Sequence, residues 1–559
     1  MRRLLLAVLA AALAAPASAH AAEPIMALGE VQVGARCTGL TVFRGIDVSS
    51  FDVEVLDVIG AERPASARLL VRVSGPAIDG TGVGPGFSGS PILCPGADGV
   101  ARTIGAISET IGEFGGRTVL ATPIESILSQ PPLPESAQPV IPGARSLAGP
   151  LTIAGLRPAL ATSFSRAASK AGRVLISSPA APRAVFDARP LVPGSAATVG
   201  ITSGDISIGA VGTVAYTDGP AVWLFGHQFD AAGRRSLFLQ DAFIHAVINN
   251  PVAVPDVSTY KLSSPGHDLG AITSDGPTAV VGIQGELPPS FPLRVTGRDS
   301  RTGRTVANVT RIADEGDVGR PAGISPLGLA GSAAVAQVAG EILAGSPSRQ
   351  SGDMCVKVTL RELRRPLRFC NTYAVEGQVP NAFAGAATAD MASATGILDA
   401  FKFGTLHPTA VEVGIRARPG IDQAFITGAT APATVRRGSR LRVRLRLRHT
   451  RTGLRSARTI LVPIPASTPR GERTVRLVGT PADVGGNPED PGDLSIVFEE
   501  EETGDDPGVQ SLAELRSSFE SIGRFDGVTA VFAGERHEVF RDPRLRITGT
   551  ERLSVRVRP

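Results

Sequence analysis

Aromatic residues are scarce in this chain of 559 residues, and its positive and negative charges nearly balance. Only 4% of the residues are Phe, Trp or Tyr, and the formal net charge is +4. So small an excess of positive charge does not favour nucleic acid as a partner, because proteins bind that polyanion through dense basic patches. We therefore expect no nucleic-acid-binding function.

Long apolar runs are absent after the first twenty residues. The start of the chain has a positive end at residues 1–3, an apolar stretch at 4–15 and small residues at 16–22. This pattern predicts a secretory signal peptide over residues 1–22, with an uncleaved membrane anchor as the alternative. No later segment has the roughly twenty apolar residues that cross a bilayer. We expect a mature chain without a transmembrane segment, secreted or located in the cell envelope.

Cysteines are few, and none forms a Cys-x-x-Cys motif or a Cys/His cluster with metal spacing. We expect no metal site and no cofactor. The four that are present are Cys37, Cys94, Cys355 and Cys370. An even number in an exported chain favours disulfides. We predict the pairs Cys37–Cys94 and Cys355–Cys370, because each pair then lies within one predicted region.

Glycine and proline are abundant, with 64 and 44 residues, and they interrupt short runs of Val, Leu and Ile. This pattern is typical of a mainly β protein. Alternation of Leu or Val with Arg over residues 441–448 predicts a strand with one buried face and one arginine face. That arginine face is either simply solvated or a surface for acidic polymers of the cell envelope.

Composition shifts divide the chain into six regions after the signal peptide. The predicted regions are a Ser-bearing β half over 23–145, a helical and loop linker over 146–190, a His-bearing β half over 191–335, a β-sandwich-like module over 350–480, an acidic loop over 481–510, and a C-terminal helix with strands over 511–559.

The stretch over residues 83–93 reads Val-Gly-Pro-Gly-Phe-Ser-Gly-Ser-Pro-Ile-Leu and follows an apolar, strand-like segment. Its Gly-x-Ser-Gly-x-Pro pattern resembles the nucleophile turn of chymotrypsin-like serine peptidases. Glycines allow a backbone that projects the serine and aims N–H groups at one point, where an oxyanion can be held. We predict Ser88 as the nucleophile and the N–H groups of Gly86 and Ser88 as the oxyanion hole. A tight turn of small residues is the structural alternative.

A serine nucleophile needs a base, and histidine suits that task. Among seven histidines, His227 follows a strand-like run at 221–225 that begins after an Asp-Gly hairpin turn. We predict His227 as the base, with a local structural hydrogen bond as the alternative. His245 lies in an apolar run and His267 in a loop-like Ser-Pro-Gly-His-Asp segment, which favours structural roles for both.

The serine turn resembles the Gly-Met-Ser-Gly-Ser-Pro motif of the SpoIVB (sporulation stage IV B) serine peptidase family, with Phe87 in the position of Met. The resemblance covers roughly residues 24–290, and Leu-Phe-Gly-His at 224–227 is similar to the family's Gly-His motif. It implies a mainly β fold, with a chymotrypsin-like two-barrel peptidase unit followed here by a C-terminal β-sandwich-like module. The family places His before Ser, whereas Ser comes first here. Exchange of the two half-barrels in the chain would produce that order.

The third catalytic residue stays open. The family's acid lies a short way upstream of the serine, but the matching residues 73–76 contain none. Asp79, Asp230 and Asp241 are the candidates, and a Ser-His dyad is another possibility.

Two functions are compatible with these residues. The first is an exported serine endopeptidase of SpoIVB type, which hydrolyses peptide bonds of a protein or peptide substrate through an acyl-enzyme at Ser88. The alternative is a non-catalytic peptide-binding or cell-envelope scaffold protein that retains the peptidase fold. The serine turn favours the first, and the missing acid with the exchanged order favours the second.

Overall fold

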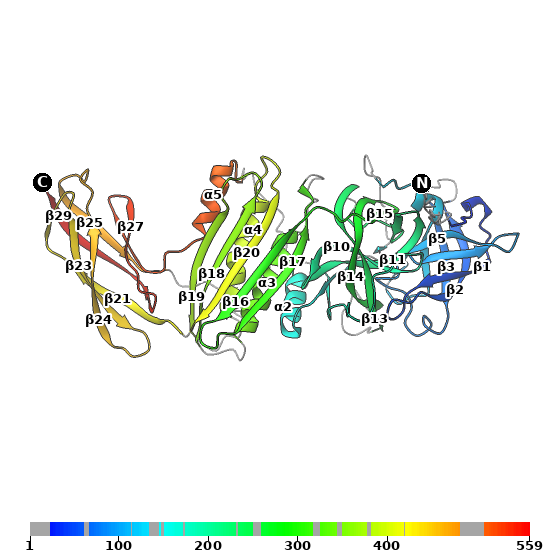
Figure 1. The fold of residues 1–559 in the computed structure, drawn as a ribbon, viewed down its shortest axis with the longest axis horizontal. Helices are drawn as coiled ribbons and strands as arrows, with labels where there is room; N and C mark the ends of the chain where they lie inside the picture. The colour runs from blue at the N-terminus through cyan, green and yellow to red at the C-terminus, as the bar shows by residue number, and fades with distance from the viewer. Residues whose placement is uncertain are drawn as a thin grey trace, which may run out of the picture.

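A computed structural model describes residues 23–60, 66–112, 114–132, 145–146, 150–170, 174–230, 233–249, 259–316, 325–343, 349–376, 382–418, 420–480 and 508–559. The predicted signal peptide and nearly all of the predicted acidic loop lie outside these residues. The described chain is mainly β, as predicted. Its β units lie in a row, with the first strands near the N-terminus at one end and the last strands at the other (Figure 1).

The first barrel comprises residues 36–123 and follows a single 3-10 turn, Leu28–Glu30. Its strands are β1 (Arg36–Thr41), β2 (Ser49–Ile59), β3 (Arg68–Ser74), β4 (Pro91–Pro95), β5 (Ala101–Thr110) and β6 (Thr118–Pro123). They pair in the order β4-β1-β2-β3-β6-β5, and β4 also pairs with β5, so the ring is closed. Alternation of buried and exposed residues along β2 points Phe51, Val53 and Val55 into its core. A short helix, α1 (Ile124–Leu128), and the two-residue β7 (Arg145–Ser146) follow.

The second barrel comprises residues 196–284. Its strands are β10 (Ala196–Gly204), β11 (Ser207–Asp218), β12 (Ala221–Leu224), β13 (Gly233–Asn249), β14 (Thr259–Gly276) and β15 (Ala279–Gln284). The order β10-β13-β14-β15-β12-β11 is closed by pairing of β10 with β11. The apolar run at 242–248, which suits a helix or a buried strand, lies in β13. In the predicted linker, β8 (Leu151–Ala154) and β9 (Leu175–Ser178) extend the sheet, because β8 pairs with β11 and β9 pairs with β8, and the helix α2 (Pro158–Lys170) connects them.

The two barrels have the same connectivity. In each, the first strand pairs with the second and fourth, the third with the second and sixth, and the fifth with the fourth and sixth. The connection between the third and fourth strands therefore occupies the same place in both rings. Ser88 lies in that connection of the first barrel, after β3, and His227 lies in that of the second, after β12.

The sheet of the second barrel continues into a further unit through pairing of β17 with β10. The added strands are β16 (Ser290–Asp299), β17 (Thr305–Ala313), β18 (Arg349–Leu360), β19 (Leu367–Glu376) and β20 (Pro408–Arg418). The helices α3 (Pro326–Ile342), α4 (Ala382–Asp399) and α5 (Leu512–Ser521) pack against these strands and share their core. The sequence division places a boundary between 335 and 350, but β16 pairs in parallel with β20, so one sheet continues across it. Pairing between segments so far apart leaves no local sequence signal.

Two further sheets enclose one core at the C-terminal end. One contains β21 (Asp422–Thr430), β23 (Arg440–His449), β24 (Arg455–Pro463) and β28 (Leu545–Thr548), and the other contains β22 (Thr434–Arg436), β25 (Gly471–Val478), β26 (Val528–Phe532), β27 (Glu535–Phe540) and β29 (Thr550–Arg558). As predicted, β23 buries its Leu and Val residues and exposes its arginines.

Both predicted disulfides are confirmed. Cys37–Cys94 joins β1 to β4 with a Cα–Cα distance of 4.4 Å, and Cys355–Cys370 joins β18 to β19 with 4.1 Å. The first bond therefore fixes the strand that begins directly after the Ser88 turn. No helix in the described part of the chain is long and apolar enough to cross a membrane.

Candidate active site

The turn that carries Ser88 is buried and requires glycine at two positions. Gly86 has φ +95° and Gly89 has φ +88°, both in the left-handed region that side chains disfavour. A Cβ on Gly89 would lie 1.9 Å from the carbonyl oxygen of Thr213 on β11. The glycines that make the sequence motif recognisable are therefore needed for both conformation and close packing against the second barrel.

The N–H groups of Gly86 and Ser88, predicted to form the oxyanion hole, have no acceptor among the described residues. The N–H groups around them are paired: that of Phe87 donates to Gly84 O, that of Gly89 to Ile107 O, and that of Ser90 to Phe87 O. Buried N–H groups are nearly always paired, so two unpaired ones on either side of a paired one are unusual.

Ser88 itself is fully buried, and its Oγ has no hydrogen-bond partner within the described chain. Its carbonyl oxygen accepts the N–H of Thr213 at 2.8 Å, which joins the turn to the second barrel. A buried hydroxyl without a partner costs about 1–3 kcal/mol. This hydroxyl does not stabilise the fold, so its presence calls for another explanation.

His227 follows two residues in the left-handed region, Phe225 and Gly226, each with φ +69°. Such a conformation in a bulky residue is strained, and strain of this kind concentrates at functional sites. The Phe225 ring stacks on the His227 ring with a centroid distance of 5.7 Å. The strained bend and the stacked Phe225 ring therefore fix the orientation of the His227 side chain after the end of β12.

The Ser88 turn and the His227 segment meet where the two barrels pack together. The Cβ position of Gly89 is 2.7 Å from the backbone nitrogen of Phe225, and Thr122 Oγ1 donates to Gly226 O at 2.6 Å. The structure thus brings both predicted segments together, but it does not place Ser88 Oγ in a hydrogen bond with His227.

The tautomer of His227 follows from its neighbour. Its Nδ1 lies 2.6 Å from the carbonyl oxygen of Gln228. A carbonyl only accepts, so Nδ1 carries the hydrogen and Nε2 holds the lone pair that a base needs. Burial, with a smaller contribution from the nearby Arg68 guanidinium, lowers the pKa of His227 to about 4, although the hydrogen bond with the Gln228 carbonyl acts in the opposite direction. The imidazole is therefore neutral over most of the pH range.

The three acids proposed as third members lie in different places. Asp79 accepts from the Gly75 N–H and pairs with Arg117 at 3.0 Å, and its side chain is half-exposed. Asp230 lies on the same loop as His227, half-exposed, with Arg235 3.9 Å away. Asp241 accepts from His267 Nδ1 at 3.0 Å, so the structure pairs it with that histidine.

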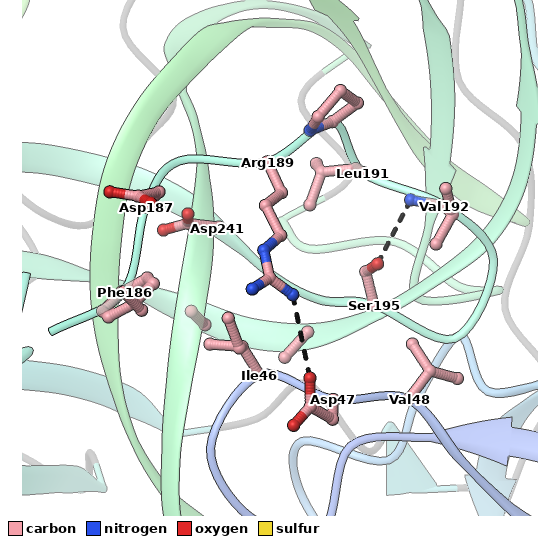
Figure 2. A pocket seen from close by; sticks show the side chains of 13 residues that line it. Ile46, Asp47, Val48, Phe186, Asp187, Arg189, Leu191, Val192, Ser195 and Asp241 are labelled. Atoms are coloured by element: carbon pink, nitrogen blue, oxygen red, sulfur yellow. Dashed lines mark hydrogen bonds and ion pairs between the residues drawn. The ribbon is translucent and has the colours of Figure 1, made fainter.

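Asp241 also lines a surface pocket of about 170 Å³ between the barrels. Figure 2 shows Arg189 in this pocket, reaching toward Asp47 at 3.8 Å. The segment 186–196 before β10 forms one wall, and residues 46–48 of the first barrel form another. Its lining residues include none from the Ser88 turn or the His227 segment.

Two buried residues near the site were not predicted from the sequence. Asp275 on β14 accepts the N–H groups of Phe229 and Asp230 at 2.7 and 2.6 Å, so it fixes the loop after His227. Burial raises the pKa of Asp275. Lys261, also on β14, is 2% exposed and contacts the Ser88 turn. In sequence, Asp275 resembles an ordinary Asp-Gly turn residue and Lys261 an ordinary strand residue, so neither carries a signal.

The described residues contain no group of three or more His, Cys, Asp or Glu side chains that could hold a metal ion. Comparisons with protein-family models, with curated proteins and with solved structures found no match.

Proposed function

We propose that this chain is an exported serine endopeptidase of SpoIVB type, which cleaves protein or peptide substrates through an acyl-enzyme at Ser88. The observation that carries the proposal is the Ser88 turn itself. Two glycines in left-handed conformations shape a turn in which the Ser88 hydroxyl is accompanied by two N–H groups, its own and that of Gly86, that have no acceptor among the described residues. Such a pair of N–H groups beside a nucleophile is what stabilises the oxyanion in acyl transfer.

A chymotrypsin-like arrangement with exchanged barrels is part of this proposal. The equal connectivity of the two rings supports it, because Ser88 and His227 lie in equivalent connections between third and fourth strands. Exchange of two equivalent barrels changes the order of the serine and the histidine along the chain but keeps their arrangement in space. The C-terminal pair of sheets is, in this proposal, a β-sandwich-like module without catalytic residues.

In the proposed reaction, His227 Nε2 takes the proton of Ser88 while Oγ attacks the carbonyl carbon of the substrate. The tetrahedral oxyanion accepts from the N–H groups of Gly86 and Ser88. His227 then gives the proton to the leaving amine, and water hydrolyses the ester by the same steps in reverse. The Gln228 carbonyl orients the imidazole, so the proposal is a Ser-His dyad. No metal or organic cofactor takes part.

Access to the site requires a movement. Ser88 is fully buried and His227 is 4% exposed, whereas a base must come within about 3 Å of the proton that it removes. In this proposal, a displacement of one barrel against the other opens the turn and brings the two side chains together. The same burial favours the alternative function, a peptide-binding or cell-envelope scaffold that keeps the fold without catalysis.

A location outside the cytoplasm, secreted or in the cell envelope, completes the proposal. The two disulfides are compatible with it, because such bonds persist in oxidising compartments.

Covalent labelling by a fluorophosphonate probe tests the function. The folded protein with a processed N-terminus should be labelled, and Ser88→Ala should abolish the labelling. Ser439→Ala is the control, because this exposed hydroxyl donates to Arg436 O and lies outside both barrels. Absence of labelling in the folded wild-type protein would contradict the peptidase proposal and leave the scaffold function.

A further inference from the structure

Lys261 is a buried lysine without a carboxylate. It is 2% exposed, and none of the ion pairs within the described chain includes it. Its Nζ donates to Thr41 Oγ1 at 2.6 Å and lies 4.4 Å from the centroid of the Phe87 ring. Burial of an unpaired ammonium is expensive, and a strand position facing a core is normally apolar. This lysine therefore opposes stability, which points to a role other than packing.

A directed chain of hydrogen bonds joins the ammonium to the serine turn. Thr213 Oγ1 donates to Gly86 O at 3.1 Å, so its single hydrogen is used there. The 3.3 Å contact between the two threonine hydroxyls must then have Thr41 as its donor. Lys261 Nζ supplies the hydrogen bond that Thr41 accepts, and it also lies 3.4 Å from Thr213 Oγ1.

The carbonyl groups that this network holds belong to the peptides around the unpaired N–H groups. The backbone N–H of Lys261 donates to Pro85 O at 2.9 Å, which fixes the peptide plane that carries the Gly86 N–H. The hydroxyl chain fixes the next carbonyl, that of Gly86. The Ser90 N–H and hydroxyl hold the third, that of Phe87, whose peptide carries the Ser88 N–H.

The lysine side chain also limits the position of the turn. A Cβ on Gly86 would lie 2.8 Å from Lys261 Cβ, so the aliphatic part of the lysine lies directly against that glycine. The ammonium over the Phe87 ring adds an attraction that depends on its charge. Backbone, aliphatic stem and ammonium thus contact three successive residues of the turn.

We propose that Lys261 is a positioning residue for the oxyanion hole: its backbone N–H holds the peptide that carries the Gly86 N–H, and its charged ammonium holds the Gly86 carbonyl and the Phe87 ring, which lie between the Gly86 and Ser88 N–H groups. The role in an oxyanion hole rests on the proposed peptidase function, whereas the contacts between Lys261 and the turn are present whether or not the protein is a peptidase. The charge comes from the second barrel and the turn from the first, so the oxyanion hole is complete only when the barrels are packed together.

Protonation of Lys261 should then control the turn. The groups that face its ammonium are Thr41 from β1, Thr213 from β11 and the Phe87 ring, and none of these titrates near neutral pH. Burial lowers the pKa of Lys261 to about 7. The charge is therefore present below pH 7 and lost above it, and the hold on the turn should weaken as the pH rises.

Amide hydrogen exchange of the peptide covering residues 84–90 in the full-length protein tests the inference. Lys261→Met should increase exchange in this peptide about tenfold, without lowering the thermal midpoint, since it removes a buried charge. Lys261→Arg should keep exchange slow. Lys357→Met is the matched control, because that exposed lysine pairs with Glu412 far along the sheet and should leave the turn unchanged.

The wild-type peptide should also exchange faster at pH 8 than at pH 6, after correction for the intrinsic rate. Thr213→Val gives a second route, because it breaks the hydroxyl chain and keeps the lysine, and it should loosen the same peptide. Unchanged exchange in both Lys261→Met and Thr213→Val would overturn the inference. An equal increase over the whole second barrel would overturn it as well, since that result indicates a purely structural role.

Fluorophosphonate labelling separates this inference from the proposed function. If the wild-type protein is labelled, its rate should fall above pH 7, and Lys261→Met should lower the rate at pH 6 at least tenfold. A labelling rate unaffected by Lys261→Met would refute the positioning role alone. Absence of wild-type labelling, with the expected exchange pattern, would refute peptidase activity and leave the role of Lys261 in the turn.

Discussion

Removal of the buried charge at Lys261 should stabilise the second barrel at acidic and neutral pH. A pKa of about 7 in the folded protein, against the ordinary 10.5, means that folding disfavours the ammonium. A difference of about 3.5 pH units corresponds to about 5 kcal/mol, at roughly 1.4 kcal/mol for each unit. Lys261→Met removes this cost, and loses a hydrogen bond to a charged group worth about 1.5–3 kcal/mol. We expect a net gain of a few kcal/mol at pH 6.

The pH dependence has a definite sign. Below pH 7 both the folded and the unfolded chain hold the proton, so the full cost of the buried ammonium is present. Between pH 7 and 10.5 the folded protein has released the proton and the unfolded chain has not, so the stability of the wild type rises with pH. The advantage of Lys261→Met should therefore shrink steadily over that interval.

Urea unfolding followed by tryptophan fluorescence suits the measurement. The chain has a single tryptophan, Trp223, which is buried on β12 of the second barrel and reports on the barrel that contains Lys261. Curves at pH 6, 8 and 10 give the difference between variant and wild type, and that difference cancels the titration of other groups. A difference that stays constant with pH would refute the reasoning, because it would mean that Lys261 has an ordinary pKa.

Two further predictions concern the frame of the site. Replacement of both Cys37 and Cys94 by serine should lower the free energy of unfolding by about 4 kcal/mol, and replacement of both Cys355 and Cys370 should lower it by about 3 kcal/mol. These values follow from the closed loops of 57 and 15 residues in the chain-entropy model. Urea unfolding measures both effects, and an unchanged midpoint in either double variant would contradict the prediction for that disulfide. Asp275→Asn should lower the fluorophosphonate labelling rate at least tenfold with unchanged circular dichroism, because Asp275 holds the loop after His227 through two N–H groups; a rate equal to that of the wild type would show that this loop needs no anchor.

Features fixed by neighbouring residues could be predicted from the sequence. The Ser88 turn depends on glycines within four residues of one another, and β23 depends on an alternation visible along the strand. The disulfides could be predicted because each bond joins cysteines within a single β unit.

Features that depend on distant segments could not be predicted. Lys261 lies 173 residues after Ser88 in the sequence (261 − 88), and only the packing of the barrels places it at the turn. Asp241 was a candidate for His227, but neighbouring strands place it beside His267, a residue assigned to a loop. The division near residue 350 failed for the same reason, because β16 and β20 pair in parallel across it.

The division of the site between two closed rings has a mechanical consequence. Each ring is braced by its own strand pairing, and the connection that carries Ser88 is also hydrogen-bonded to the second ring through Thr213 and Lys261. The separation of Ser88 and His227 then depends on the joint between the rings as well as on the loops that carry them. A rotation of a few degrees at that joint changes the separation while each ring keeps its hydrogen bonds. Substitutions on the contact surface between the barrels, even far from Ser88, would therefore change the distance between Ser88 and His227.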